Sequence, residues 1–266
     1  LGHAWTAACW KASGALRSRE KALILLLRDT DSRLRAVLPL RHNRITRHIR
    51  FLEDVRTQRL NLLAARGAEE AGWAWAAAEL RRRRDWDRCD LNALPAAAAA
   101  QAAAAFQAAG LPPRLRGRGW QRRIRLESPW PGIEAEFRPE LRANYRRRRK
   151  RLEALGSLQL TAVNEPQALH QHLADCLALE QAGWKGAHGT AMLDSPGTTR
   201  FYQKLAFRLA ARGQLRIFCL RLNQRLIAFE YCCLDPHTRR LYSLKIAYDE
   251  TLRACSPGSV LRWLLL

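Results

Sequence analysis

Short apolar runs bounded by polar turns predict two β-hairpins that lie far apart in the chain. The first joins residues 21–28 and 33–40 through Asp29-Thr-Asp-Ser32, and the second joins residues 214–222 and 225–234 through Asn223-Gln224. β-prone runs flanked by turn-forming residues are typical of hairpins. Arg33-Leu34-x-Ala36 in the first matches Arg225-Leu226-x-Ala228 in the second, so the pattern favours a duplicated unit. Leu38 stands in the first copy where Glu230 stands in the second, so the first copy is expected to be chemically silent.

Helical patterns fill the chain between the two hairpins. Residues 68–84 and the alanine-rich residues 96–109 predict two helices. Residues 112–125 form a basic, glycine-containing connection. Residues 139–155 predict a third helix, whose apolar side carries Leu141, Tyr145, Leu152 and Leu155.

The last part of the chain predicts the order strand, helix, helix, three strands, loop and helix. Strand 158–163 precedes a helix that starts at Asn164, with Gln167 placed to complete a capping box. A loop leads from there to a helix over residues 198–212. The whole pattern predicts an α+β fold with mixed, mainly antiparallel sheets flanked by helices. We expect two domains, residues 1–138 and residues 139–266.

Size and composition fit a globular protein. The chain has 266 residues, of which 48% are hydrophobic, and no apolar run reaches the ~20 residues that a membrane span needs. It starts at Leu1 and ends within a helical pattern, so we expect a fragment that lacks segments at both ends. Seven cysteines without framework spacing favour a reducing compartment, the cytoplasm. No Cys/His cluster has zinc spacing, so no metal is expected.

The charge is strongly positive. The formal net charge is +22, which favours polyanionic partners such as nucleic acid, acidic lipid or a phosphorylated ligand. Arginine-rich composition with solvated charges is the alternative explanation. The same two interpretations apply to the run Arg146-Arg-Arg-Arg-Lys-Arg151 on the third predicted helix. Nucleic acid is therefore a possible partner that the sequence does not favour.

The end of the chain carries the most specific pattern. An apolar strand, Ser243-Leu-Lys-Ile-Ala-Tyr-Asp-Glu250, runs through Ser256-Pro-Gly-Ser259 into a new helix at Val260. A helix N-terminus presents backbone N–H groups without partners, which suits a phosphate or pyrophosphate.

The residues of this region resemble the GNAT acyltransferase superfamily. The resembling residues are Glu180-x-x-x-Trp184-Lys-Gly186, Gly189-Thr190, Phe201-Tyr202, Ala228-Phe-Glu230, Leu244-Lys-x-Ala-Tyr-Asp-Glu250 and Ser256-Pro-Gly258. They are most similar to the branch associated with cellulose and exopolysaccharide biosynthesis (CelD-like), which is related to the Fem-type aminoacyltransferases. The resemblance covers residues 141–266 well. It implies a tandem GNAT-like fold, with a degenerate first unit and a second unit that lacks its C-terminal part.

The resemblance also implies an acyl-CoA donor, acetyl-CoA or a longer ester, as co-substrate. Its pyrophosphate would bind the loop after the fourth strand, at Arg253, Ser256, Pro257, Gly258 and Ser259. The usual GNAT loop has more glycines than this one. Any general acid supplied by the family's later segments lies outside the sequence.

Three residues are candidates for catalysis. Glu230 could act as a general base towards an amine, or pair structurally with Lys245 on the next strand. Lys245 could stabilise negative charge on the acyl oxygen. Glu180, one helical turn before Trp184, could hydrogen-bond the acceptor. The substrate-binding candidates are Trp184, Lys185, Tyr248 and Asp249, with core packing and loop organisation as their alternative roles.

Three functions follow from these observations. The first is direct acyl transfer from acyl-CoA to an amine or hydroxyl of a small molecule, saccharide or peptide, without a metal or a covalent intermediate. The second is a tRNA-dependent aminoacyltransferase or an RNA-binding protein, motivated by the charge. The third is a non-catalytic scaffold in a polysaccharide synthesis complex.

Overall fold

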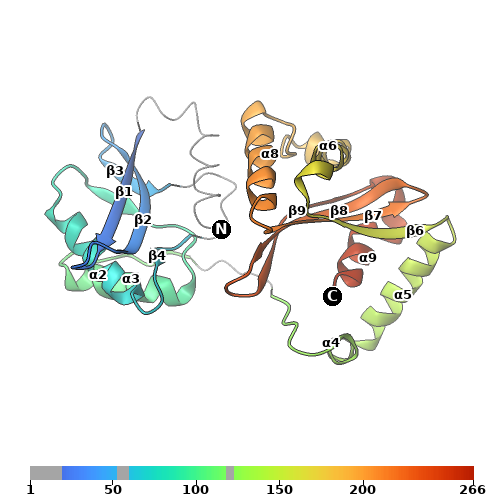
Figure 1. Cartoon of the computed structure of the whole chain (residues 1–266), viewed down its shortest axis with the longest axis horizontal. Coiled ribbons are helices and arrows are strands. Elements are labelled where there is room, and N and C mark those ends of the chain that lie inside the picture. Colours follow the sequence, from blue (N-terminus) through green and yellow to red (C-terminus); the bar gives the residue numbers. More distant parts are fainter. Residues whose placement is uncertain (1–19, 53–59, 118–122) are drawn as a thin grey trace. The chain divides into compact units, whose positions relative to one another are not determined.

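The structure, a computed structural model, describes residues 20–52, 60–117 and 123–266. Their contacts divide them into two compact units, one up to residue 117 and one from residue 123 onward. Figure 1 shows the elements of both units. The domain boundary expected after residue 138 stays a prediction.

The N-terminal unit contains one mixed sheet with two helices against it. The strand order is β1-β2-β3-β5, and β4 pairs with β2. The strands are β1 (Glu20–Arg28), β2 (Leu34–Asn43), β3 (His48–Phe51), β4 (Leu63–Ala64) and β5 (Arg88–Asp90), and the helices are α2 (Glu69–Arg82) and α3 (Ala96–Ala108). The predicted hairpin is confirmed as β1–β2, and the two predicted helices are confirmed. The core contains Leu38, Leu40, Phe51, Trp73 and Leu80.

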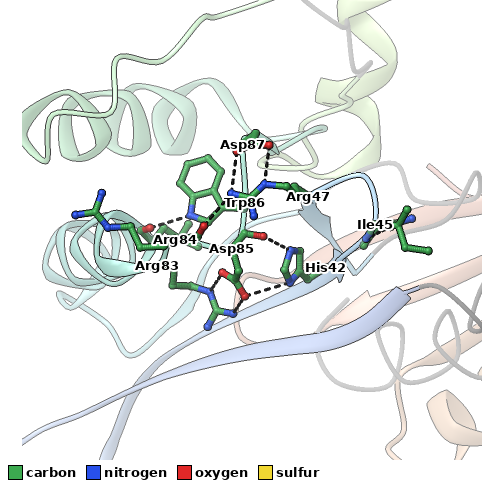
Figure 2. Close-up of polar contacts among 10 residues, drawn as sticks. His42, Ile45, Arg47, Arg83, Arg84, Asp85, Trp86 and Asp87 are labelled. Atoms are coloured by element: carbon green, nitrogen blue, oxygen red, sulfur yellow. Dashed lines mark hydrogen bonds and ion pairs between the residues drawn. The ribbon is translucent and has the colours of Figure 1, made fainter.

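Polar contacts attach the segment after α2 to the β2–β3 turn, as Figure 2 shows. Arg47 Nε donates to Asp87 Oδ2 at 2.7 Å, and Arg47 Nη2 donates to the Arg84 carbonyl at 2.8 Å. His42 Nε2 lies 2.9 Å from the carbonyl oxygen of Asp85. The hydrogen bond from Arg47 lowers the pKa of the Asp87 carboxyl. These contacts place β5 beside β3 in a parallel pair.

The C-terminal unit contains a four-stranded antiparallel sheet in the order β6-β7-β8-β9. Its strands are β6 (Leu158–Val163), β7 (Leu215–Leu222), β8 (Arg225–Asp235) and β9 (Arg240–Tyr248). Its helices are α4 (Trp130–Glu136), α5 (Pro139–Glu153), α6 (Pro166–Ala182), α7 (Trp184–Ala187), α8 (Pro196–Ala210), the 3₁₀ helix η2 (Glu250–Cys255) and α9 (Pro257–Leu264). The order predicted for this part of the chain is confirmed.

Helices cover both faces of this sheet. In Figure 1, α6 and α8 lie on one face, and α9 lies on the other. Neighbouring residues of a strand point to opposite faces. Accordingly, Tyr231 of β8 donates its hydroxyl hydrogen to the carbonyl of Tyr202 on α8, while Glu230 contacts α9. Any side chain on β8 or β9 therefore belongs to one face only.

Two details of α6 and its connection differ from the sequence prediction. Helix α6 starts at Pro166 after Glu165, and no side chain caps it, so the capping box at Asn164 does not form. Pro166 takes the first helical position, where a missing N–H costs nothing, so Glu165 and not Asn164 is the residue that precedes the helix. The predicted loop over residues 183–197 contains the short helix α7.

Among the residues that the structure describes, no helix is both long enough and apolar enough to cross a bilayer.

Candidate active site

A buried carboxylate in the last turn of α6 organises the segment from Glu180 to Met192, which we call the α6–α7 corner. Glu180 is 1% exposed. Its Oε1 lies 3.0 Å from Lys185 Nζ and 3.3 Å from Lys245 Nζ, and its Oε2 accepts from the Met192 N–H at 2.7 Å. A carboxylate this far from water is stable only when paired and hydrogen-bonded. The two ammonium groups and the amide meet that requirement.

The same corner is attached to β9. Lys185 Nζ donates to the carbonyl of Ile246, and Lys245 Nζ donates to the carbonyl of Thr190 at 3.3 Å. The backbone N–H of Trp184 donates to Glu250 Oε1 at 2.8 Å. Residues just after α6 are therefore joined to the end of β9 at several points, although they lie about sixty residues away in the chain.

β9 is the last strand of its sheet, so one of its edges has no partner strand among the described residues. The Ile246 carbonyl, which accepts from Lys185, points to that edge. In a strand the N–H and C=O of one residue point the same way, so the Ile246 N–H points there too. A register shift between Tyr231 and Cys232 leaves Leu244 as an extra residue in β9, which is a β-bulge. The site thus has a free strand edge beside a bulge and two lysines.

The alternative role of Glu230, a structural pair with Lys245, is wrong. The register pairs Glu230 with Ile246 and Tyr231 with Lys245, one residue away from the alignment that the pair needs. Glu230 instead accepts from Arg262 of α9 at 3.0 Å, on the face opposite α6. Burial and the charge of Glu230 raise the pKa of the Cys232 thiol on this same face. Glu230 and Glu180 therefore cannot act on one substrate atom.

The predicted anion loop forms the junction between η2 and α9. Ser256 adopts a left-handed conformation with φ 47°, and its carbonyl accepts from the N–H groups of Ser259 and Val260. The Ser256 N–H donates to the Arg253 carbonyl, and Pro257 has no N–H. Within residues 256–260, this leaves the buried Gly258 N–H as the amide without a hydrogen-bond partner among the described residues. The loop is thus a much smaller anion site than a row of free amides would be.

Gly258 packs closely against β9. A Cβ atom at this position would lie 3.4 Å from Tyr248 Cδ1 and 3.7 Å from Ile246 Cδ1, which are ordinary contact distances. Arg253 is exposed, and Ser256 and Ser259 are half-buried. The exposed guanidinium and the two hydroxyl groups add to what the Gly258 amide offers an anion.

A cavity of about 580 Å³ lies between α6, the β7–β8 turn and the end of β9. Apolar side chains of α6 and β8 form part of its wall, together with Tyr248. Its charged lining residues are Asp175, Arg221, Arg225, Asp249 and Glu250. Asp175 pairs with Arg221 at 3.0 Å, and Asp249 pairs with Arg225. Asp249 also accepts from the Thr251 N–H at 2.9 Å and so caps η2.

The sequence candidates therefore fall into four groups. Glu180, Lys185 and Lys245 meet in one cluster, with Trp184 beside it and 52% exposed. Tyr248 and Asp249 line the cavity, and Arg253 to Ser259 form the loop at α9. Glu230 is on the other face with Arg262.

Sequence reasoning did not assign roles to Glu250 or Arg262. Glu250 is the last residue of the motif that ends the final strand and directly follows Asp249, so its position could have marked it as a candidate. Arg262 gave none, because its contact with Glu230 depends on how α9 packs. In the described part of the chain, no group of three or more His, Cys, Asp and Glu residues is placed to hold a metal ion.

Comparison with known proteins supports the fold. Residues 139–266 match the family model described as the acetyltransferase (GNAT) domain. No curated protein matches the chain significantly. Among solved structures, the chain resembles the C-terminal domain of an Agrobacterium fabrum protein described as a lysylphosphatidylglycerol synthetase. The TM-score is 0.53 at 10% identity, over 97% of this chain and 72% of that one. The mixed α+β architecture with two mainly antiparallel sheets is thus that of a GNAT-like fold.

Proposed function

We propose that residues 139–266 catalyse transfer of an acyl group, acetyl or longer, from acyl-CoA to an amine or hydroxyl acceptor. The observation that carries this proposal is the free edge of β9, which leads through η2 to the N-terminus of α9 within a segment that matches the GNAT domain. This arrangement can hold a phosphate group near a strand that offers a free N–H. Direct transfer needs little more than two oriented substrates.

In this proposal the donor and its reacting carbonyl use different parts of the site. Gly258 N–H, the hydroxyl groups of Ser256 and Ser259, and Arg253 bind the pyrophosphate. The Ile246 N–H polarises the thioester carbonyl, because it points to the free edge. Lys185, Lys245 and Glu180 act as positioning residues that hold the α6–α7 corner against this edge. Glu230, on the opposite face, has no part in the transfer.

Thermal unfolding of the full chain with a panel of CoA esters tests the proposal. A ligand at a hundredfold excess over its Kd stabilises a protein by about 2.7 kcal/mol. For a unit of this size that corresponds to a rise in Tm of about 5–10 °C. Gly258→Asp should abolish the rise, because its carboxylate repels the pyrophosphate. Gly258→Ala, which the packing tolerates, should keep it. If no CoA ester raises the Tm, the proposal fails.

A second candidate is transfer from an aminoacyl-tRNA, and the charge of α5 favours it. Arg147, Lys150 and Arg151 are exposed and form no ion pair with a described carboxylate, whereas Arg146 pairs with Glu134 and Arg149 with Glu153. The similar solved structure is described as the C-terminal domain of a lysylphosphatidylglycerol synthetase, a name that fits transfer of an amino acid.

Salt dependence separates the two donors. Each phosphate contact adds about 0.7–0.9 to the slope of log K against log salt. Replacing Arg147, Lys150 and Arg151 with Gln should therefore lower the slope for tRNA binding by about 2 to 3. RNA binding that persists in Gly258→Asp, without any stabilisation by CoA esters, would favour the tRNA donor.

The wider process is a further part of the proposal. The resemblance to CelD-like proteins favours a role in polysaccharide or cell-envelope biosynthesis, and it leaves a non-catalytic scaffold as the third candidate. Lys185→Ala combined with Gly258→Asp separates the scaffold from an enzyme. Normal assembly of that variant with its partners, together with no turnover by the parent protein, would indicate a scaffold.

A further inference from the structure

The cavity between α6, the β7–β8 turn and the end of β9 carries one carboxylate that its own surroundings do not neutralise. Of its five charged residues, Asp175 and Arg221 form one ion pair, and Asp249 and Arg225 form another. Glu250 makes no ion pair with a described Lys, Arg or His. The lining set therefore has a net charge of −1, in a chain whose formal net charge is +22.

The structure holds the Glu250 side chain at this wall of the cavity. Its Oε1 accepts from the Trp184 N–H at 2.8 Å. A Cβ atom on Gly183 would lie 3.2 Å from the same oxygen, so the missing side chain at Gly183 lets α6 end close to Glu250. A carboxylate fixed by a backbone hydrogen bond loses little further freedom when it binds a ligand.

The remaining lining residues fit an alkyl chain that ends in a cation. Leu179, Ala182 and Leu226 supply apolar surface. An ammonium group at the end of such a chain is attracted to the Glu250 carboxylate. An anionic ligand would meet Glu250 without a free partner for its charge, since both arginines are already paired.

We propose that this cavity binds a protonated primary amine on an alkyl chain, with Glu250 as the carboxylate that receives the ammonium group. The amine belongs to the acceptor, an inference that rests on the proposed acyl transfer, and the reaction type is N-acylation. The ammonium group gives one proton to the Glu250 carboxylate, and the freed nitrogen forms a bond to the acyl carbon. The C–S bond of the thioester then breaks, and CoA leaves as the thiol with the second proton of the nitrogen. The cavity reaches Gly183, two residues before Lys185, whose ammonium group contacts β9 at Ile246. The amine site and the proposed donor site therefore share the same strand end.

Three small ligands of equal length test the charge preference on the full chain. We would titrate n-pentylamine, 1-pentanol and pentanoate into ¹⁵N-labelled protein and follow the amide signals of Gly183, Trp184, Glu250 and Thr251. Pentylamine should shift these signals with saturation, while pentanol and pentanoate bind at least about tenfold more weakly, since a hydrogen bond between charged groups is worth roughly that factor. Equal binding of the amine and the alcohol, or tighter binding of pentanoate, overturns the proposal.

A matched pair of variants tests the residue. Glu250→Gln should weaken pentylamine at least about fivefold, as expected for loss of one charged partner. Glu165→Gln makes the same charge change at the exposed opposite end of α6 and should leave the affinity unchanged. Unchanged affinity in Glu250→Gln overturns the proposal. If Glu250→Gln does not fold, the comparison of the three ligands on the unaltered chain still shows whether the cavity prefers an amine.

The outcome is separable from that of the proposed function. If pentylamine binds as expected while no CoA ester raises the Tm, the amine site stands and the acyl-CoA donor fails. If CoA esters raise the Tm while the amine and the alcohol bind equally, the donor stands and the amine site fails.

Discussion

Replacing Glu180 with Gln should destabilise the C-terminal unit by about 3 kcal/mol or more. The substitution keeps the size of the side chain and removes its charge, so that Lys185 and Lys245 lose their shared counter-ion. Both lysine side chains are only 16% exposed. Two ammonium groups would then lie close together with little water to solvate them.

The magnitude follows from the distances. At an effective dielectric constant of about 20, charges 3.0 and 3.3 Å apart attract each other by about 5 kcal/mol each. Desolvation of the three groups offsets much of this gross energy. Removing one partner of a buried ion pair nonetheless costs about 3–5 kcal/mol, because the other charge remains buried. The Met192 N–H also loses an ionised acceptor.

Urea unfolding, combined with hydrogen exchange at the Met192 amide, measures this effect for the unit concerned. Glu153→Gln is the control, because Glu153 pairs with Arg149 at the surface, where its side chain is 43% exposed. Exposed helix pairs contribute about 0.3–0.5 kcal/mol. A loss of less than about 1 kcal/mol in Glu180→Gln would refute the view that the lysines depend on this carboxylate.

Three other predictions concern glycine packing, pH and thiol reactivity. Gly186→Ala should cost about 2 kcal/mol or more in urea unfolding, because its Cβ would lie 1.9 Å from the Gln181 carbonyl oxygen, while Gly258→Ala should cost less than about 1 kcal/mol. Burial lowers the pKa of His48. The neutral imidazole therefore contributes to stability above pH ~6.5, and this contribution is lost as the pH falls and the ring becomes protonated. In His48→Gln the Tm should fall less between pH 7 and pH 5 than it does in the parent protein. Burial raises the pKa of Cys89 to about 12, so peptide-resolved alkylation at pH 8 should be slow until urea unfolds the chain. Equal costs for the two glycine variants, an unchanged pH slope, or rapid alkylation of native Cys89 would contradict these predictions in turn.

The elements that local patterns encode could be predicted from the sequence. Leu169, Leu173 and Leu177 recur at helical spacing, and all three are buried side chains of α6. The β7–β8 hairpin follows from its apolar runs and the turn at Asn223 and Gln224, both of which have positive φ. Each of these features depends on neighbours within a few residues, where side-chain periodicity and turn chemistry decide the structure.

The features that the sequence could not give depend on register and on pairing between distant segments. A shift of one residue in the β8–β9 register decides whether Lys245 faces Glu230 or Glu180, and a bulge at Leu244 lies within that pairing. A one-residue slip reverses the face of every following side chain, and no local pattern reveals it. The parallel pairing of β3 with β5 was missed because β5 has only three residues and is placed by contacts such as that between Arg47 and Asp87.

The α6–α7 corner explains why the two proposals concern one place in the fold. Glu180 fixes Lys185, and Lys185 in turn binds the β9 carbonyl at Ile246, the residue whose N–H faces the proposed donor. The adjacent Trp184 N–H holds Glu250 at the cavity wall. A buried ion cluster contributes little net stability compared with apolar packing, so its value lies in fixing geometry. In the two proposals it holds the strand edge offered to the thioester in a fixed position relative to the carboxylate offered to the amine, and direct transfer depends on such fixed orientation of two substrates.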